Sequence, residues 1–552
     1  MFTGTFTDVN DGFECGLIFF DQKLIHGLQP ADNEGTRTRQ KKKNSVEQLF
    51  HRFQDSILAL TSPVSFRNLM LNIAHVRALL FLLPTLSARS PHPKVLLISF
   101  DGFRYDLLNS STVPNIYNAA REGVWFTEGV SPQYVTMTST NHMGLSTGLH
   151  AESHGVVGNV FYEKSTLRKF DYFNLSHTPG VIKDSKDPQW VRGEPIWVTN
   201  EKADATRHSA CLYWPLGDIQ FPNAEMPKFF KAWKDYGTLK EWKQDVDTIV
   251  EFFNQTESPM NFVAWYVSEP DHTLHENGFF NGELPKTLKQ LDEVFGYLIE
   301  RLSTEELLDQ INIVFTADHG HSEIEGTKKM MCIKDYVDYN RVHYAERMLY
   351  ANDEETIQEA YRNLTRAQKD FKFKMYFRND TVLKRYFYTK MPDRIGDIVL
   401  EPEVGYEVGN KCSKKELRWM FDSGMKKFNS STHGQAPENR EMRAVLFIRG
   451  PAVDPLQMTN PVQVIDIYNM MCALLEIQPA PNNGSTARIG LGRFMKSQKS
   501  MQYNEIIMIS VAAGTVPMMI IIVAMLYICL KSPSEVSYME ESAKSSSLSS
   551  EV

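Results

Sequence analysis

The sequence predicts an α/β fold with a mostly parallel central sheet. Three short, continuous apolar runs support this prediction, because such strands are typical of parallel sheets that are buried on both faces. Of the 552 residues, 42% are hydrophobic and 23% are charged, so most of the chain has the composition of a globular protein. Roughly 400 contiguous residues contain no linker rich in Pro, Gly or Ser, which favours one large α/β body with an insertion.

Each predicted strand leads into an acidic segment. The strands lie within residues 94–103, 262–267 and 311–315, and the first ends in Asp101. The segments behind the other two carry Asp271, His275, Asp318 and His319. Open α/β sheets bind ligands at the carboxyl ends of their strands, and aspartate and neutral imidazole are common zinc ligands. One Asp-His pair is often only a hydrogen-bonded loop histidine, but three such strand ends predict a metal site.

A nucleophile for that site is expected in residues 134–148. This stretch, which includes Thr138, changes from an extended pattern to a helical one and offers a Thr or Ser at the start of the helix. A hydroxyl at such a position can be a plain helix cap. Beside a metal, the same hydroxyl can be ionised and attack phosphorus.

Two further regions complete the predicted body. Residues 336–410 carry helical and strand patterns, such as 354–369, without metal ligands, and they predict a small α+β insertion. Residues 463–475 have apolar side chains at spacings of three and four, which predicts an amphipathic helix packed on the sheet.

Both ends of the chain carry membrane-related patterns. Residues 506–530 form an uncharged, mostly apolar run that is long enough for a transmembrane helix. Residues 70–88 have the order of regions of a signal peptide. Residues 1–69 are then an alternative extension or a gene-model artefact, although a cytoplasmic tail before a signal anchor is the other interpretation. We expect a single-pass type I protein of the cell membrane, with an extracellular ectodomain at 91–500 and a cytoplasmic tail at 531–552.

Sequons and cysteines agree with an extracellular body. N-glycans are predicted at seven sequons, all before the apolar run: Asn109, Asn174, Asn254, Asn363, Asn379, Asn429 and Asn483. Four cysteines lie in the expected ectodomain and allow two disulfides in three connectivities: Cys211, Cys332, Cys412 and Cys472. The formal charge of −8 argues against a nucleic-acid polymer as partner.

Several segments, taken in order, resemble one enzyme family. They read LLISFDGFRYDLL, TGLHAESHGVVGN, GEPIWVTN, EPDHTLH, TADHG and THG. Together they are similar to the nucleotide pyrophosphatase/phosphodiesterase (NPP) family of the alkaline phosphatase superfamily, and most of all to its small single-span members. The similarity runs from Lys94 to about Asn483. It implies an alkaline-phosphatase-like three-layer sandwich, followed by one C-terminal transmembrane helix.

The resemblance also implies two zinc ions and a phosphothreonine intermediate. One zinc would be held by Asp101, Thr138, Asp318 and His319, and the other by Asp271, His275 and His433. Thr138 would attack phosphorus, and water would then hydrolyse the ester. Asn159 matches a family asparagine that helps to hold a phosphate oxygen. His433 is a ligand that only the resemblance identifies.

The expected substrate pocket departs from the family pattern. Ser139 stands where nucleotide-cleaving relatives have a phenylalanine that packs on the base. Trp214 and Asp218 match pocket positions in part, and Tyr236 or Trp233 would supply the opposing aromatic face. The leading expectation is an extracellular zinc phosphodiesterase for nucleotide-type phosphodiester or pyrophosphate bonds. The alternatives are a choline-phosphate or lysophospholipid diesterase, which Ser139 favours, and a catalytically weak cell-surface glycoprotein.

Overall fold

The computed structural model describes residues 90–173, 186–222, 224–234, 237–422, 426–460 and 462–496. The expected extension, signal peptide, transmembrane helix and cytoplasmic tail lie outside these residues, as do Tyr236 and the sequon at Asn174. Within the described ranges, no helix is long and apolar enough to cross a membrane.

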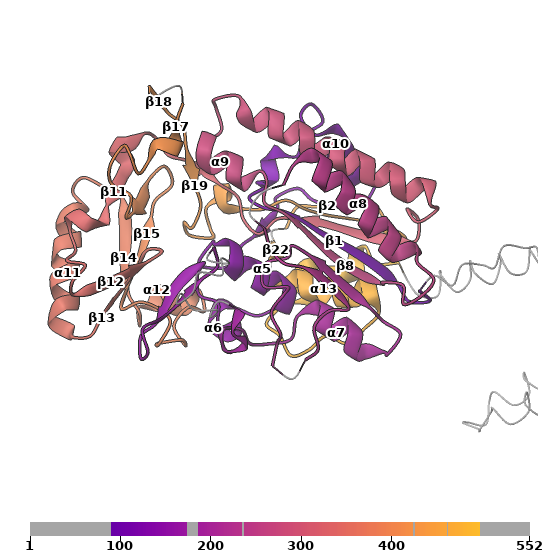
Figure 1. Cartoon of the computed structure of the whole chain (residues 1–552), viewed down its shortest axis with the longest axis horizontal. Helices are drawn as coiled ribbons and strands as arrows, with labels where there is room; N and C mark the ends of the chain where they lie inside the picture. Colours follow the sequence, from indigo (N-terminus) through magenta and orange to yellow (C-terminus); the bar gives the residue numbers. More distant parts are fainter. Residues whose placement is uncertain are drawn as a thin grey trace, which may run out of the picture. The chain divides into compact units, whose positions relative to one another are not determined.

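A sheet of eight strands carries the main core, in the order β21-β2-β20-β9-β1-β8-β6-β7 (Figure 1). Its strands are β1 (Lys94–Phe100), β2 (Val124–Phe126), β6 (Ser209–Leu212), β7 (Phe229–Lys231), β8 (Phe262–Val267), β9 (Ile311–Thr316), β20 (Leu446–Arg449) and β21 (Leu456–Met458). β20 runs antiparallel to both of its neighbours, and the other pairs in this sheet are parallel. The sheet is therefore mixed.

The three predicted strands are adjacent in this sheet. β1 lies between β8 and β9, and all three are buried along their whole length. Val95 pairs with Phe262, and Lys94 pairs with Ile311. Because the three strands are parallel, the chain leaves them at the same edge of the sheet. The segments that follow them are thereby brought together.

Helices cover both faces of the sheet. On one face, α10 (Glu283–Thr304) packs against α8 (Leu239–Asn254) and α4 (Pro114–Arg121); on the other, α13 (Asp466–Leu475) packs against α5 (Thr138–Thr147) and α7 (Ile196–Ala203) (Figure 1). Each helix turns apolar residues inward, as Val246, Ile249, Val250 and Phe253 do in α8. The result is a three-layer α/β sandwich, in which α13 lies within the predicted range 463–475.

A second, smaller sheet is formed by the part of the chain that follows β9 and precedes β20 in the sequence. Its strands pair antiparallel in the order β12 (Val342–Ala345), β13 (Met348–Ala351), β15 (Ile398–Pro402) and β14 (Phe373–Phe377), together with α11 (Glu354–Ala367) and α12 (Thr381–Arg385). It has its own hydrophobic cluster, in which Leu349, Leu364 and Ile398 are completely buried. This insertion lies at the left of Figure 1. Nearby, β11 (Met330–Cys332) pairs with β16 (Glu407–Gly409).

Short elements shape the loops around the sheet. The strand pairs are β3 (Val130–Ser131) with β22 (Val462–Gln463), β4 (Val160–Glu163) with β5 (Arg168–Asp171), β10 (Ser322–Glu323) with β19 (Ser431–Thr432), and β17 (Phe421–Asp422) with β18 (Lys427–Phe428). The short helices are α6 (Ala151–His154), α9 (Asp271–Asn277) and α14 (Thr486–Ile489).

One of the two possible disulfides forms. Cys332, at the end of β11, is bonded to Cys412, behind β16, and the two Cα atoms are 5.2 Å apart. The second disulfide that the four cysteines allow does not form among the described residues, since Cys211 and Cys472 are free thiols. Both are 1% exposed, in β6 and α13. They pack in the core as small apolar side chains.

Candidate functional site

The predicted metal ligands come together at the sheet edge where β1, β8 and β9 end. Asp101 follows β1, Asp271 begins α9 behind β8, and Asp318 and His319 follow β9. A hydrogen bond from Asp271 N to Asp101 O (3.0 Å) joins the first two segments. His433 reaches the same place from the segment behind β19. The strand order assembles the site, since β8 and β9 are the two neighbours of β1.

Two glycines allow these segments to approach closely. Gly102 has φ +68°, and a Cβ on it would lie 2.9 Å from Asp271 Cβ. Gly434 has φ +95°, and its Cβ would lie 2.2 Å from Arg347 Nη1 and 2.7 Å from Met137 Cε. A side chain is therefore excluded at both positions.

The first group of ligands surrounds His319 Nε2. This nitrogen lies 3.1 Å from Asp318 Oδ2, 3.6 Å from Asp101 Oδ1 and 3.4 Å from Thr138 Oγ1. Asp101 Oδ1 and Asp318 Oδ2 are buried without a hydrogen-bond partner among the described residues. Buried carboxylate oxygens need a partner, and a cation between them supplies one. These residues therefore fit a metal ion.

The other carboxylate oxygens are held by the protein. Tyr266 OH donates a hydrogen bond to Asp101 Oδ2 (2.6 Å), and Gly102 N donates to Asp318 Oδ1 (3.2 Å). Each of the two aspartates thus has one carboxylate oxygen held by a hydrogen bond from the protein and one oxygen that can bind a metal. Outer-shell hydrogen bonds of this kind commonly orient metal ligands.

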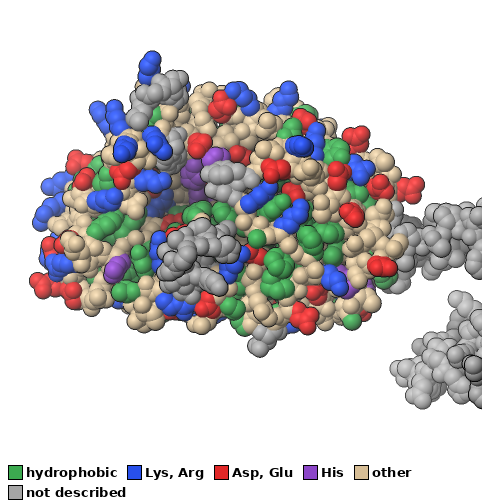
Figure 2. All heavy atoms as spheres, viewed as in Figure 1, with side chains coloured by type: hydrophobic (Ala, Val, Ile, Leu, Met, Phe, Trp, Pro, Cys, Tyr) green, Lys and Arg blue, Asp and Glu red, His purple; other side chains and the backbone are tan. Residues whose placement is uncertain are grey.

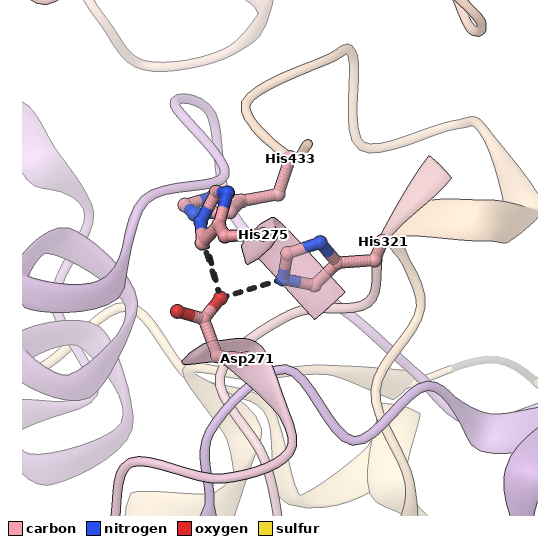
Figure 3. Close-up of side chains that lie close together, drawn as sticks. All are labelled: Asp271, His275, His321 and His433. Atoms are coloured by element: carbon pink, nitrogen blue, oxygen red, sulfur yellow. Dashed lines mark hydrogen bonds and ion pairs between the residues drawn. The ribbon is translucent and has the colours of Figure 1, made fainter. Parts of the chain in front are cut away.

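The second group of ligands surrounds Asp271 Oδ1 (Figure 3). This oxygen lies 3.5 Å from His275 Nε2, 3.7 Å from His433 Nε2 and 2.5 Å from His321 Nε2. Asp271, His275 and His433 are predicted ligands, whereas His321 is not. The sequence offered one sign that His321 could be a ligand, because it follows His319 by two residues and lies behind the same strand, β9.

The three predicted histidine ligands are oriented by backbone carbonyls. Nδ1 of His275 lies 3.2 Å from Ser431 O, Nδ1 of His319 lies 3.1 Å from Gly320 O, and Nδ1 of His433 lies 2.7 Å from Thr136 O. Because a carbonyl only accepts, each Nδ1 carries the proton and donates it. In the neutral ring each Nε2 then has a lone pair that can bind a metal.

The site strongly shifts the pKa values of its side chains. Burial raises the pKa of Asp101 well above its usual range, and the Asp318 and Asp271 carboxylates add to the shift. Burial also raises the pKa of Asp318 to about 7. Burial lowers the pKa of His319 and His433 well below the usual range. The lowered pKa values of His319 and His433 favour the neutral imidazole that a metal ligand requires, and a cation would displace protons from the Asp101 and Asp318 carboxyl groups.

Thr138 is the first residue of α5, and Met137 occupies the cap position. The Thr138 side chain is therefore not used as a helix cap. Its hydroxyl faces His319, while its carbonyl accepts a hydrogen bond from His142 Nδ1 (2.9 Å). The amino end of a helix favours negative charge. An alkoxide at Thr138 Oγ1 would be stabilised in this position.

Asn159 is oriented by Ser139. Its Oδ1 accepts a hydrogen bond from Ser139 N (2.7 Å), and Ser139 Oγ lies 2.8 Å from the same oxygen. The amide nitrogen of Asn159 is thereby turned away from Ser139. Ser139 is completely buried. The sequence did not predict this role, because the two residues belong to different elements.

The insertion also reaches into the site, through the two-residue turn between β12 and β13. Glu346 Oε2 accepts hydrogen bonds from the backbone nitrogens of Asn159 (2.5 Å) and Val160 (3.1 Å). Arg347 pairs with Glu407 (2.6 Å) and donates to Thr432 Oγ1 (3.2 Å), next to His433. The turn therefore contacts both the asparagine and the ligand-bearing segment. Sequence reasoning placed no site residue here.

A cavity of about 450 Å³ opens beside these residues, and its lining includes Asn159, Phe173, His275, Arg347 and His433. Histidine side chains are visible there in a hollow of this face, with Lys and Arg side chains near it (Figure 2). Phe173 is 54% exposed, and its ring centroid is 6.3 Å from that of Trp233. The Trp233 ring also contacts Tyr172, with centroids 4.7 Å apart. An aromatic group of Tyr172, Phe173 and Trp233 thus adjoins the cavity.

Two predicted pocket residues have other partners in the structure. Trp214 is 1% exposed and donates its Nε1 hydrogen to Ser146 Oγ (2.9 Å). Asp218 pairs with Lys186 Nζ at 2.5 Å. Tyr236 lies outside the described residues. Contact of these three residues with a substrate therefore stays a prediction.

Comparisons with known proteins agree with this geometry. The model of the family "Type I phosphodiesterase / nucleotide pyrophosphatase" matches residues 95–436. The chain is 30% identical over 406 residues to bis(5'-adenosyl)-triphosphatase ENPP4 of Pongo abelii, covering 72% of this chain and 81% of that protein. It is 28% identical over 410 residues to ectonucleotide pyrophosphatase/phosphodiesterase family member 7 of Rattus norvegicus, with 72% and 86% covered.

A solved structure shows the same fold. Inactive murine ectonucleotide pyrophosphatase/phosphodiesterase 5 in complex with AMP superimposes with a TM-score of 0.62 and 25% identity, covering 72% of this chain and 98% of that chain. The family predicted from the sequence is confirmed. The chain belongs to the type I phosphodiesterase / nucleotide pyrophosphatase family and is a phosphoric diester hydrolase.

Proposed function

We propose that this enzyme hydrolyses nucleotide-type phosphodiester or pyrophosphate bonds with two zinc ions and Thr138 as nucleophile. The observation that carries the proposal is the convergence of two ligand groups beside the Thr138 hydroxyl, one of which holds two buried, unpartnered carboxylate oxygens. The relatives named above support the nucleotide substrate, since one is called a bis(5'-adenosyl)-triphosphatase and another was solved with AMP.

The residues fit two metal positions. Asp101, Thr138, Asp318 and His319 would hold one zinc, and Asp271, His275 and His433 the other. When bound, the ions would supply Lewis-acid stabilisation of the charge on phosphoryl oxygens.

The protein's own groups account for the displacement steps. The Thr138 hydroxyl loses its proton to solvent, and its oxygen bonds to phosphorus while the bond to the leaving oxygen breaks. The leaving group takes up a proton. A water oxygen then replaces Thr138 Oγ1 on phosphorus, and Thr138 regains its proton. The Asn159 amide, turned by Ser139, donates a hydrogen bond to a phosphoryl oxygen.

Thr138 variants test the nucleophile. In the purified full chain, Thr138→Ala should lower kcat for p-nitrophenyl thymidine monophosphate by roughly 10³-fold or more, because the variant lacks the hydroxyl that attacks phosphorus. Thr138→Ser should retain part of the activity. Thr140→Ser is the matched control, because Thr140 lies in the same helix and its hydroxyl has no hydrogen-bond partner among the described residues. Acid-quenched turnover should trap a thymidylyl group on Thr138, bonded through phosphorus, and the same group found on any other residue would contradict the mechanism.

A choline-phosphate ester is the second candidate substrate, because aromatic rings can bind a quaternary ammonium as well as a nucleobase. The exposed face of Phe173 is the position to test. We expect Phe173→Ala to raise KM for nucleotide diesters with a smaller change in kcat, since base stacking contributes about 1–3 kcal/mol and exists before the transition state. Phe230→Ala, at a 44% exposed phenylalanine of β7, is the control. Glycerophosphocholine turned over faster than nucleotide diesters would favour the second candidate.

We also propose that the catalytic body lies outside the cell, attached to the membrane by residues 506–530. The sequons before this run and the Cys332–Cys412 disulfide support the proposal, since disulfides persist in oxidising compartments. The sequon at Asn429 is an exception, because its side chain is buried and does not fit the predicted glycan.

A further inference from the structure

His321 lies among the predicted ligands of the second metal position, although it belongs to neither predicted ligand set. It is completely buried. One ligand atom from each of Asp271, His275, His321 and His433 lies within 4.8 Å of the others. The His321 ring is close to the other two, with centroids 4.8 Å from His275 and 5.1 Å from His433. Figure 3 shows its Nε2 directed at the Asp271 carboxylate.

The hydrogen bonds around Ser431 fix the tautomer of His321. The Ser431 hydroxyl donates its only proton to Leu274 O (2.8 Å). Ser431 Oγ must therefore accept from His321 Nδ1, which lies 3.1 Å away. A neutral His321 then carries its proton on Nδ1 and a lone pair on Nε2. This is the same tautomer as in His275 and His433.

That lone pair faces an acceptor. His321 Nε2 lies 2.5 Å from Asp271 Oδ1, and a carboxylate oxygen cannot donate a proton when it is ionised. Two lone pairs at this distance repel each other unless a cation is shared between them. Two ligands of one zinc lie roughly 3.3 Å apart in a tetrahedral site, so a bound ion would widen this contact towards the 3.5 Å and 3.7 Å at which His275 and His433 already lie from Asp271 Oδ1.

We propose that His321 is a fourth protein ligand of the metal position formed by Asp271, His275 and His433. The inference rests on the metal centre of the proposed function and extends it. Three imidazole nitrogens and one carboxylate oxygen complete a tetrahedral set, whereas a catalytic zinc usually has only three protein ligands and one open position. A substrate oxygen would enter here as a fifth ligand.

The two metal positions then differ in character. The first metal position has one imidazole nitrogen, from His319. Its other ligand atoms are oxygens, from Asp101, Asp318 and Thr138. The position that includes His321 is rich in nitrogen, which favours zinc over magnesium or calcium. We expect its ion to be retained longer during dialysis against a chelator.

The experiment counts histidine ligands in the full-length protein loaded with Co²⁺. Each histidine bound to the paramagnetic ion through Nε2 gives one strongly shifted, exchangeable Nδ1–H proton resonance. Four such resonances are expected, from His275, His319, His321 and His433. In the His321→Gln variant three of these resonances should remain. Competition with a chelator should show that the affinity for Zn²⁺ is lowered by at least about 10-fold at one of the two metal sites. His343→Gln, in β12, is the matched control and should show all four.

Three resonances in the wild-type protein would overturn the proposal, whether or not the variant folds. The same holds if His321→Gln is folded and binds Zn²⁺ with unchanged affinity at both sites. These results would leave the proposed function intact, because two metals would still bind. A wild-type protein that is active and binds no metal would instead contradict the proposed function itself.

Discussion

Ser139 is a buried support for Asn159, although its place in the sequence suggested an open substrate pocket. Both its backbone nitrogen and its hydroxyl lie within hydrogen-bond distance of Asn159 Oδ1, and its hydroxyl is also 3.0 Å from Gly158 O. A larger side chain has no exposed face here. The position therefore controls the direction of the Asn159 amide more directly than it controls base stacking.

A phenylalanine at position 139 should accordingly damage the site. We expect Ser139→Phe to lower the free energy of unfolding by about 1–3 kcal/mol through overpacking, and to lower kcat by displacing Asn159. Ser139→Ala keeps the backbone hydrogen bond and loses one hydroxyl contact of roughly 1 kcal/mol, so its kcat should fall less than about 10-fold. Denaturant unfolding and steady-state kinetics measure both effects. A stable Ser139→Phe variant with a lower KM for nucleotides would show that the side chain faces the substrate instead.

Some of the site residues that the sequence predicted carry a local signal, and others do not. Asp101, Asp271 and Asp318 each follow a buried strand, so their meeting could be inferred from the parallel sheet alone. His433 follows the two-residue strand β19, and only the family resemblance identified it. Ser139 contacts Asn159, twenty residues away, and no local pattern reports that contact. His321 lies two residues behind His319, but its contact with Asp271 becomes visible only in the folded chain.

Among the elements, the turn between β12 and β13 brings the insertion to the catalytic body. Glu346 and Arg347 both have positive φ values, 42° and 72°, which are unusual for residues with side chains. The turn directs the Glu346 carboxylate to the backbone at Asn159 and the Arg347 guanidinium to Glu407. Burial raises the pKa of Glu346 to about 8, although the hydrogen bonds from Val160 and Asn159 oppose the shift.

The raised pKa of Glu346 predicts a pH dependence of stability. A carboxyl group whose pKa is higher in the folded than in the unfolded protein contributes most to the free energy of unfolding at low pH, because the folded state holds the proton more tightly. That contribution is lost as the pH rises from about 4.5, the ordinary value, towards about 8. Glu346→Gln should therefore lose less stability than the wild-type protein between pH 5 and pH 8.

Urea unfolding at several pH values measures this difference. Glu300→Gln, at an exposed residue of α10, should follow the wild-type curve and serves as the control. Parallel curves for Glu346→Gln and the wild-type protein would show that Glu346 is ionised in the folded state throughout this range.

Helices and strands with a regular apolar pattern in the sequence could be predicted, and those without one could not. The strands β1, β8 and β9 and the helix α13 correspond to uninterrupted or periodic apolar patterns. The antiparallel strand β20 was not predicted, because its four residues give no signal for direction. The disulfide partner of Cys332 could not be chosen from spacing, since the pairing with Cys412 depends on how β11 and β16 lie in the folded chain.

At the scale of the whole molecule, the orientation in the membrane can be tested directly. On intact cells, protease should remove an epitope tag placed before Lys94 and spare one placed after Val552, because the proposed span at 506–530 separates them. A chain that starts at Met70 should still be exported. If protease removed the carboxy-terminal tag and spared the tag before Lys94, the topology would be the opposite of the one proposed. If the chain that starts at Met70 stayed in the cytosol, the predicted signal peptide would be wrong.

The pairing of β1 with β8 also has a consequence during synthesis. The first neighbour of β1 is separated from it by about 170 residues, and at roughly 5–20 residues per second its translation takes on the order of ten seconds or more. Throughout that interval the nascent chain carries the mostly apolar segment KVLLISF without either of its neighbouring strands, although every residue of this segment is buried in the folded protein. We therefore expect newly made chains of this protein to need a chaperone at this segment until β8 has been made.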